Sequence, residues 1–343
     1  MDKKKGNKGL LIGLCVFLSI LMGAMILVAV YADFLLDRIG RYDENKESVY
    51  TPEQVATMTE DDPFPTDFSG PTYAPEDVPL LPDAVLPPAD TDAIVNILLI
   101  GQDRRQGEGR QRSDTMILCT FHKEKGTITM TSFLRDLYVS IPGYKANKLN
   151  AAYKWGGMPL LTRTLYENFG VEVDACVEVD FGGFVELVDL VGGVEITLTE
   201  QESRYLQTVG NFAVRPGKNR LTGEQALFYA RLRKLDDDFH RTQRQRNVLS
   251  ALLKSCSGLS LPQMHNLLMT ALPMVVTDMT NGEMVAYLME LFPLITAGEV
   301  KTLQIPAEGM YEDARVGNMQ VLLTDPAATR DYLRQELLGW NSR

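Results

Sequence analysis

The order of apolar and polar residues from residue 94 onward alternates between two periods. Short apolar runs, typical of buried strands, occupy residues 96–101, 115–121, 127–133, 175–180, 194–198 and 300–305. Longer stretches with apolar residues three or four positions apart predict helices at 158–168, 181–190, 223–228, 241–255, 282–295 and 325–338. Asp325 and Pro326 suit the N-cap and first turn of the last helix.

Strands interleaved with helices indicate an α/β fold in which helices cover both faces of a central sheet. The first strands follow one another closely and can pair as hairpins, so we expect a mixed sheet. The predicted architecture is a three-layer α/β/α sandwich with a mixed central sheet, formed by a domain at residues 94–343 and preceded by one transmembrane helix.

The prediction of a transmembrane helix comes from residues 9–32, which are 24 residues without a charge. As a helix this segment would be about 36 Å long, enough to cross a bilayer core with some tilt. Lys3, Lys4, Lys5 and Lys8 precede it, so we expect residues 1–8 to be a cytoplasmic tail and the domain to be extracytoplasmic. A cleaved signal peptide is the alternative, but the apolar run exceeds the usual length of about 7–15 residues.

The residues between this segment and the domain, 33–93, are predicted to form a linker. Within it, residues 51–92 carry nine of the 17 prolines, ten acidic residues and no Lys or Arg. This stretch accounts for −10 of the net charge of −11, and its composition favours an extended, solvated chain. The rest of the chain, with a net charge of −1, has no broad basic face, which disfavours binding to nucleic acid.

The sequence offers little support for several common kinds of site. Only three His are present, which argues against a His-rich metal centre, and Cys119, Cys176 and Cys256 lack the spacing of a zinc site or disulfide framework. We expect these cysteines to be small buried apolar side chains. The chain contains no GxxxxGK[ST] phosphate loop, no HExxH and no GxSxG motif.

A first group of candidate residues lies in the segment 101–114, which joins two predicted strands and contains four arginines and three glycines. If the two strands are neighbours, Asp103 and Asp114 face each other across the base of the loop. Such carboxylates suit Mg²⁺, which keeps several waters and binds substrate phosphates. Arg112 beside them has the planar fork that matches a phosphate. The alternative is a solvated surface loop with internal salt bridges.

A second group begins with Arg231 and Arg233, which share one face if this segment is extended. In the helix that follows, Arg241 and Gln245 fall on the same stripe as apolar residues at about 100° per residue, so both should face inward. Burying such polar groups requires a partner or a ligand. The alternative for Arg241 is an internal ion pair with an acidic residue at 236 or 238.

Other polar residues have less specific placements. Arg246 points away from this stripe and is expected at the surface, whereas Arg244 lies at its edge and fits either environment. Arg135 follows a predicted strand, at a position where loop sites often begin, and the segment 148–153 opens a helix-like stretch. A structural role is equally open for Arg135 and for this segment.

Taken in order, these strings resemble the LytR-CpsA-Psr family of bacterial cell-envelope proteins, from about residue 94 to the C-terminus. The matching strings are NILLIGQD (96–103), RSDT (112–115), RD (135–136), KLNAAY (148–153), VDFGGF (179–184), VGGVE (191–195), LTGEQA (221–226), RLR (231–233) and RTQRQ (241–245). The chain departs from the family pattern at Leu134, Gln102 and His240, which replace a usual Pro, aliphatic residue and Gly. These changes bear on loop shape and polymer preference more than on activity.

The resemblance implies a membrane-anchored, Mg²⁺-dependent phosphotransferase outside the cell membrane of a Gram-positive-type envelope. Such an enzyme moves a glycopolymer, such as teichoic acid or capsular polysaccharide, from a polyprenyl-pyrophosphate carrier to a peptidoglycan hydroxyl, and it holds the lipid tail in an apolar cavity. The alternatives are a lipid-pyrophosphate hydrolase and a non-catalytic protein that binds wall polymer or lipid phosphate.

The resemblance also implies roles for individual residues. Asp103 and Asp114 would hold Mg²⁺ and serve the acceptor proton, and with Arg112 and Arg135 they would form the catalytic group. The residues expected to bind the pyrophosphate are Arg105, Arg112, Arg135, Arg231, Arg233, Arg241 and Gln245.

Overall fold

The fold was analysed in a computed structural model of the chain. The structure describes residues 30–43, 49–58, 68, 70–78, 80, 93–102, 110–232, 235, 238–256, 259–297 and 299–338.

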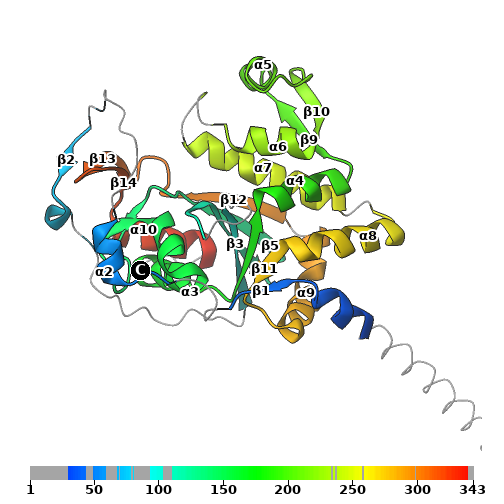
Figure 1. The fold of residues 1–343 in the computed structure, drawn as a ribbon, viewed down its shortest axis with the longest axis horizontal. Coiled ribbons are helices and arrows are strands. Elements are labelled where there is room, and N and C mark those ends of the chain that lie inside the picture. Colours follow the sequence, from blue (N-terminus) through cyan, green and yellow to red (C-terminus); the bar gives the residue numbers. More distant parts are fainter. Residues whose placement is uncertain are drawn as a thin grey trace, which may run out of the picture.

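The strands and helices follow one another along the whole described chain (Figure 1). The strands are β1 (Gly40–Arg41), β2 (Thr72–Tyr73), β3 (Ile94–Gln102), β4 (Ser113–His122), β5 (Thr127–Phe133), β6 (Tyr138–Val139), β7 (Asn147–Lys148), β8 (Ala175–Asp180), β9 (Val194–Leu198), β10 (Gly217–Leu221), β11 (Val275–Thr277), β12 (Glu299–Ile305), β13 (Glu312–Val316) and β14 (Met319–Leu323).

The helices are α2 (Pro52–Thr57), α3 (Leu149–Phe169), α4 (Phe181–Leu190), α5 (Glu200–Thr208), α6 (Gly223–Ala230), α7 (Asp238–Cys256), α8 (Leu261–Ala271), α9 (Asn281–Ala297) and α10 (Pro326–Leu333). Short 3₁₀ turns occupy Pro75–Asp77 and Leu272–Met274, and a π-helical turn, Arg334–Leu338, follows α10. Residues 30–36 form an additional N-terminal helix, before β1.

A seven-stranded mixed sheet forms the centre of the domain, with strand order β1-β11-β8-β3-β4-β5-β12. The pairs β3–β4 and β4–β5 are antiparallel hairpins, whereas β3 runs parallel to β8 and β5 runs parallel to β12. The prediction of an α/β fold with a mixed sheet is confirmed. Smaller sheets pair β9 with β10, β6 with β7, and β13 with both β14 and β2.

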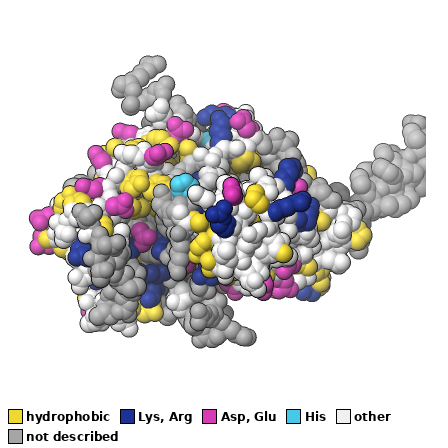
Figure 2. All heavy atoms as spheres, turned by 90° about the horizontal axis from the view of Figure 1, so that it is seen from above, with side chains coloured by type: hydrophobic (Ala, Val, Ile, Leu, Met, Phe, Trp, Pro, Cys, Tyr) yellow, Lys and Arg dark blue, Asp and Glu magenta, His cyan; other side chains and the backbone are white. Residues whose placement is uncertain are grey.

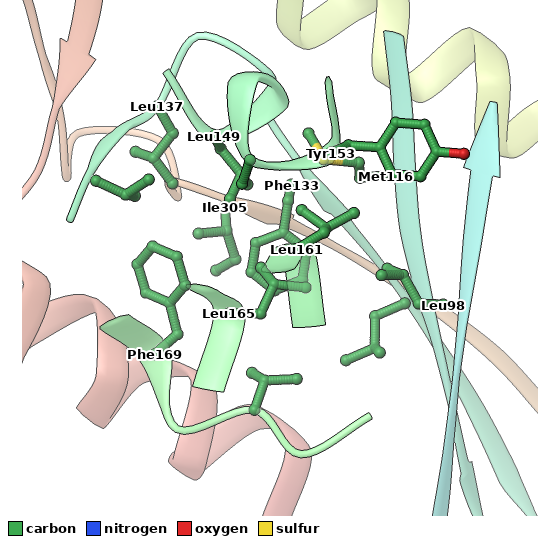
Figure 3. Packing of buried hydrophobic residues seen from close by; sticks show 14 of the residues in the cluster. Leu98, Met116, Phe133, Leu137, Leu149, Tyr153, Leu161, Leu165, Phe169 and Ile305 are labelled. Carbon is green, nitrogen blue, oxygen red and sulfur yellow. The ribbon is translucent and has the colours of Figure 1, made fainter. Parts of the chain in front are cut away.

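Alternate residues of the central strands point to opposite faces of the sheet, as the strand period requires. Leu98 and Met116 belong to a large core cluster with α3 and α10 on one face (Figure 3). Ile117 and Cys119 belong to a second cluster, which packs against α9 on the other face. The sheet therefore lies between two helical layers, with α3 and α10 on one side and α4, α6, α7 and α9 on the other.

Several predicted segments agree with the structure to the residue. The predicted segments 127–133, 175–180 and 181–190 coincide with β5, β8 and α4. The segment 194–198 is a strand as predicted, but it pairs with β10 outside the central sheet. Helix α3 begins at Leu149, nine residues before the predicted start at 158, and it is kinked at Gly157, whose dihedrals of φ 67° and ψ −152° are not helical.

The linker expected to be solvated is in part packed against the domain. Thr51 and Gln54 form a capping box at the start of α2, and Val55 of this helix is only 1% exposed within the large core cluster. Strand β2, also from the expected linker, pairs in parallel with β13. The composition of the segment predicted solvation because it contains few apolar residues. This prediction failed for α2 and β2 because their packing partners lie far away in the sequence.

The predicted transmembrane segment 9–32 lies outside the described residues except for its last three positions. Among the described helices, none combines the length and the low charge that a membrane span requires.

Replacing Val55 tests the packing of α2. The change Val55→Ala removes two buried methyl groups and should lower the free energy of unfolding by about 1.5–2.5 kcal/mol. Val49→Ala, at a position that is 54% exposed, is the matched control and should change it by less than about 0.5 kcal/mol. Chemical denaturation of the three proteins measures both values, and equal small effects would show that α2 is not part of the core.

Candidate functional site

A cavity of about 740 Å³ lies between one face of the central sheet and helices α4, α6 and α7. Its walls are mostly apolar: β3, β4, β8 and β11 contribute Leu99, Ile117, Val177, Val179 and Val275, and the helices contribute Phe184, Leu187, Leu227, Val248, Leu249 and Leu252. Cavities of this size and character bind small ligands or lipid chains, with a few polar groups fixing the orientation.

Five charged or amide side chains also line this cavity, and they come from four separate parts of the chain. They are Asp114, Arg135, Arg231, Arg241 and Gln245. Asp114 is the second residue of β4, Arg135 follows the end of β5, and Arg231 caps the C-terminus of α6. Arg241 and Gln245 belong to the first turns of α7 and project from it together with Val248 and Leu252, as the helical stripe predicted.

Asp114 and Arg135 form an ion pair at the cavity wall. The distance between Arg135 Nη1 and Asp114 Oδ1 is 2.7 Å, and the two side chains are 20% and 23% exposed. Arg135 Nε also lies 3.3 Å from Asp136 Oδ2, and Lys148 Nζ lies 3.0 Å from Asp136 Oδ1. Alternating charges thus run from β4 through the end of β5 to β7, and they hold the Arg135 guanidinium in one orientation.

Arg241 acts on the same carboxylate, Asp136, as Arg135 and Lys148. Burial by itself would raise the pKa of the Asp136 carboxyl, but Arg135, Lys148 and Arg241 together hold this pKa below its ordinary value. Arg241 is 2% exposed and lies near the start of α7, where the helix dipole adds positive potential. Two arginines of the cavity, Arg135 and Arg241, therefore act on one region of space, which suits an anionic ligand.

Arg231 is positioned by an aromatic ring. Its Cζ lies 4.4 Å from the centre of the Phe181 ring, a cation–π geometry, and Phe181 also lines the cavity. Phe181 is the first residue of α4, directly after the Asp180 N-cap, so the start of one helix supports the cation at the end of another.

Not every predicted residue can be placed. Asp103, Arg105 and Arg233 lie outside the described residues. Arg112 is described and partly buried, but it is not among the residues that line the cavity. The acidic residues at 236 and 238, the alternative partners of Arg241, have no described side chains, and among the described carboxylates Arg241 acts on Asp136.

Two further arginines of α7 are structural. The prediction that Arg246 lies at the surface is wrong, because its side chain is buried and Nη1 donates to Ser132 Oγ at 2.7 Å. Burial lowers the pKa of this guanidinium to about 10. Arg244 donates to Glu202 Oε1 at 2.8 Å and to the Leu232 carbonyl oxygen at 3.2 Å. Helix α7 packs against elements on several sides, so three of its faces carry buried cations.

The sequence did not predict a buried polar network behind the site. Gln102, at the end of β3, donates to Glu178, and Tyr153 of α3 donates to the same carboxylate. Gln102 Oε1 also accepts the backbone N–H of Gln111 at 3.1 Å, which joins the two ends of the 103–109 segment. The sequence signal for this network was Glu178, a glutamate at a core-facing position of the apolar strand ACVEVD.

A second departure from the family pattern also has a structural role. Leu134, where the family usually has Pro, is fully buried, and its backbone N–H donates to the Ile305 carbonyl oxygen at 2.8 Å. Proline has no N–H and could not make this bond between the ends of β5 and β12.

Two of the expected buried thiols are confirmed: Cys119 and Cys176 are both buried, and burial raises the pKa of Cys119 to about 12.

The described residues contain no group of three or more His, Cys, Asp or Glu side chains that could hold a metal ion. Asp114 is the one described carboxylate among the cavity-lining residues, and Asp103 lies outside the described residues. Magnesium typically binds one or two carboxylates together with substrate phosphates and water. Among the described residues of the cavity, Asp114 can supply one such carboxylate, and a bound phosphate would supply further oxygens.

The sequence model of the LytR_cpsA_psr family matches residues 69–330. This chain belongs to the LytR-CpsA-Psr family. The polyisoprenyl-teichoic acid–peptidoglycan teichoic acid transferase TagT of Bacillus subtilis is 34% identical to it over 232 residues, covering 64% of this chain and 70% of TagT. The regulatory protein MsrR of Staphylococcus aureus is 30% identical over 261 residues, covering 73% of this chain and 77% of MsrR.

Solved structures of family members share the fold. TagT bound to LIIa-WTA superposes with a TM-score of 0.60 at 28% identity, covering 75% of this chain and 94% of that one. TagT with bound octaprenyl pyrophosphate lipid gives a TM-score of 0.57 at 26% identity, with 74% and 95% covered. TagT, which shares this fold, therefore binds LIIa-WTA and octaprenyl pyrophosphate lipid.

The ion pairs around Asp136 predict a pH dependence of stability. Because the folded-state pKa of Asp136 is lowered, its contribution is present above the ordinary Asp pKa of about 3.9 and is lost as the pH falls through the folded pKa. Lys148→Met removes one cation and should raise that pKa. The stability advantage of the wild type over this variant should therefore be largest near neutral pH and shrink below about pH 4.

Denaturant unfolding at a series of pH values measures this difference. Lys145→Met, at an exposed position three residues away, is the matched control and should differ from the wild type by a pH-independent amount. A constant difference for Lys148→Met as well would mean that Lys148 does not act on the Asp136 carboxyl.

Proposed function

We propose that this protein is a phosphotransferase of the cell envelope that moves an anionic glycopolymer from a polyprenyl-pyrophosphate carrier to a peptidoglycan hydroxyl. The observation that carries the proposal is the composition of the cavity, whose walls are mostly apolar and carry one carboxylate, three guanidiniums, an amide and the Thr115 hydroxyl. A pyrophosphate joined to a long hydrocarbon chain likewise has a charged part and a much larger apolar part. The names of the TagT relative and its ligands support the same assignment.

In the proposed complex, the pyrophosphate lies among Arg135, Arg231 and Arg241, and the hydrocarbon chain lies along the apolar walls. Arg135 is oriented by Asp114 and Asp136, and Arg231 by the Phe181 ring. Preorganised cations of this kind stabilise charge that develops on phosphate oxygens without reorganising during the reaction. Gln245, one helical turn after Arg241, adds an uncharged hydrogen-bonding group.

In the proposed reaction, the acceptor hydroxyl attacks the phosphorus that carries the sugar. A new P–O bond forms to the acceptor, the bond from that phosphorus to the bridging oxygen breaks, and polyprenyl phosphate leaves with the negative charge. The acceptor proton passes to a carboxylate; Asp103 is the first candidate, and it can take the proton only while it is not bound to a metal ion. Positioning and charge neutralisation account for most catalysis of phosphoryl transfer, and the three arginines supply both.

We further propose that Mg²⁺ is the cofactor, held by Asp103 and Asp114 together with the pyrophosphate. When bound, the ion would neutralise charge on the phosphate oxygens. The proposed location is the outer side of the membrane of a Gram-positive-type envelope, with residues 9–32 as an uncleaved anchor and residues 1–8 in the cytoplasm.

The arginines can be tested directly. Arg135→Ala and Arg231→Ala should lower the rate of polymer transfer on the order of 10²–10³-fold, because each removes a preorganised cation from the phosphates. Arg163→Ala, on the outer surface of α3 with a side chain that is 67% exposed, is the control and should transfer at the wild-type rate. Transfer is measured with lipid-linked polymer and peptidoglycan, after thermal unfolding shows that the variants are folded. Near-normal rates for both cavity variants would reject the assignment.

Chelation distinguishes the enzyme from its alternatives. A chelator should stop transfer and added Mg²⁺ should restore it, whereas binding of the carrier by a non-catalytic protein involves no turnover in either condition. A hydrolase would release free polymer at the same rate with or without peptidoglycan. The proposed transferase should instead give a peptidoglycan-linked product that depends on the acceptor, as mass spectrometry of the reaction products can show.

A further inference from the structure

Exposed apolar side chains gather at one end of the molecule. Thirteen large apolar side chains are exposed in the described part of the chain, and eight of them lie in the N-terminal helix, in α9 and at the start of β12. These eight are Val30, Tyr31, Phe34, Leu288, Met289, Phe292, Ile295 and Val300. Exposed apolar patches of this kind mark sites of interaction with proteins or membranes.

Helix α9 is apolar on its outer as well as its inner side. Leu291 and Leu294 face the sheet and are buried, while Leu288, Met289 and Ile295 are 59%, 75% and 42% exposed. A helix at the surface of a soluble domain normally carries a polar outer face. We call the exposed residues Leu288, Met289, Phe292 and Ile295 the α9 face.

The few charges of α9 lie to one side of this face. Glu283 and Glu290 are seven residues apart and therefore share a flank of the helix, and Glu290 Oε1 pairs with Lys123 Nζ at 2.9 Å. Leu288, Phe292 and Ile295, spaced by four and three residues, follow the opposite flank. The α9 face thus has a polar edge on one side only, as expected for a helix lying flat on an apolar phase.

The N-terminal helix is bonded to the start of α9. Asn281 Nδ2 donates to Asp33 Oδ1 and to Asp37 Oδ1, each at 2.7 Å, and Arg41 Nη1 donates to the Met279 carbonyl oxygen at 2.7 Å. Figure 1 shows the dark blue N-terminal helix beside α9. The uncharged segment 9–32 ends inside this helix, one residue before Asp33. A membrane boundary at that point would therefore also lie at the start of α9.

We propose that the α9 face, together with the exposed residues of the N-terminal helix, lies in the outer interface of the lipid bilayer. The proposal rests on the anchorage proposed above for residues 9–32. Leu288 is seven residues beyond Asn281, about 10 Å along the helix axis, so the face begins close to the anchor. The α9 face contains no Lys or Arg, so its contact with lipid is apolar and does not need anionic headgroups.

This orientation connects the bilayer with the cavity. Leu249 of α7 and Leu99 of β3 line the apolar part of the cavity and also pack against the cluster that contains Leu291 and Leu294 of α9. The inner side of α9 and the cavity therefore share one apolar region of the same sheet face. Docking through the outer side of α9 brings that region next to the hydrocarbon in which a polyprenyl carrier is dissolved.

The face of the molecule seen in Figure 2 is different in character. Acidic and basic side chains are interspersed there with small apolar patches, which is typical of a surface in contact with water. A second copy of the chain is the other possible occupant of the α9 face. The continuity of the face with the uncharged segment that leads into the N-terminal helix favours lipid.

Fluorescence quenching tests the proposal. The full chain carrying Met289→Trp is reconstituted into phosphatidylcholine vesicles whose acyl chains are brominated, because bromine quenches only indoles that reach the acyl region. Most of the emission from the introduced tryptophan should be lost relative to unbrominated vesicles, after subtraction of the wild-type signal. Tyr166→Trp is the matched control on α3, at a residue that is 42% exposed on the opposite face of the sheet, and its emission should be unchanged.

The outcomes separate the two proposals. If the wild-type chain does not float with vesicles in a density gradient, both the anchorage and the docking are overturned. If it floats but the tryptophan at 289 is no more quenched than the one at 166, the docking is overturned and the anchorage stands. Emission at 289 that changes with protein concentration in detergent, without quenching in vesicles, would assign the α9 face to a second copy of the chain. Quenching is independent of polymer transfer, so a failure of the enzymatic proposal leaves this test valid.

Discussion

The cavity depends on carboxylates that neutralise the positive charges of its arginines. Arg135, Arg231 and Arg241 all line one largely apolar cavity, where neighbouring cations repel one another and burial disfavours the charge of Arg241. Asp114 and Asp136 offset this cost for Arg135, and the lowered pKa of Asp136 shows that the carboxylate in turn is stabilised by the cations. The pyrophosphate that we propose as ligand would balance the charge of these guanidiniums.

The central sheet makes this arrangement possible because its two faces serve different purposes. On one face, Leu98 and Met116 form a dense core with α3, and the Gln102–Glu178–Tyr153 network lies on the same side. On the other face, alternate residues of the same strands line the cavity. Strands β3 and β4 can therefore be held rigidly by one layer while they present Asp114 and an apolar wall to the other.

The sequence determined the local parts of this structure. The alternation of apolar residues defined β5 and β8 to the residue, and the stripe on α7 placed Arg241 and Gln245 on the same side as Val248 and Leu252. Both results follow from backbone periods of two and 3.6 residues, which do not depend on distant contacts. The resemblance to a family added the expectation that guanidiniums far apart in the chain meet, and the structure brings Arg135, Arg231 and Arg241 to one cavity.

Tertiary structure alone decided what each side chain meets. Arg244 and Arg246 differ from Arg241 by only three and five residues, yet one pairs with Glu202 and the other reaches Ser132, because different elements pack on each side of α7. The sequence placed Val55 in a solvated linker, but in the structure residues far along the chain bury it in the core. Periodicity sets the direction in which a side chain points, but the packing of distant segments sets whether that direction leads to water, to a counter-charge or to a cavity.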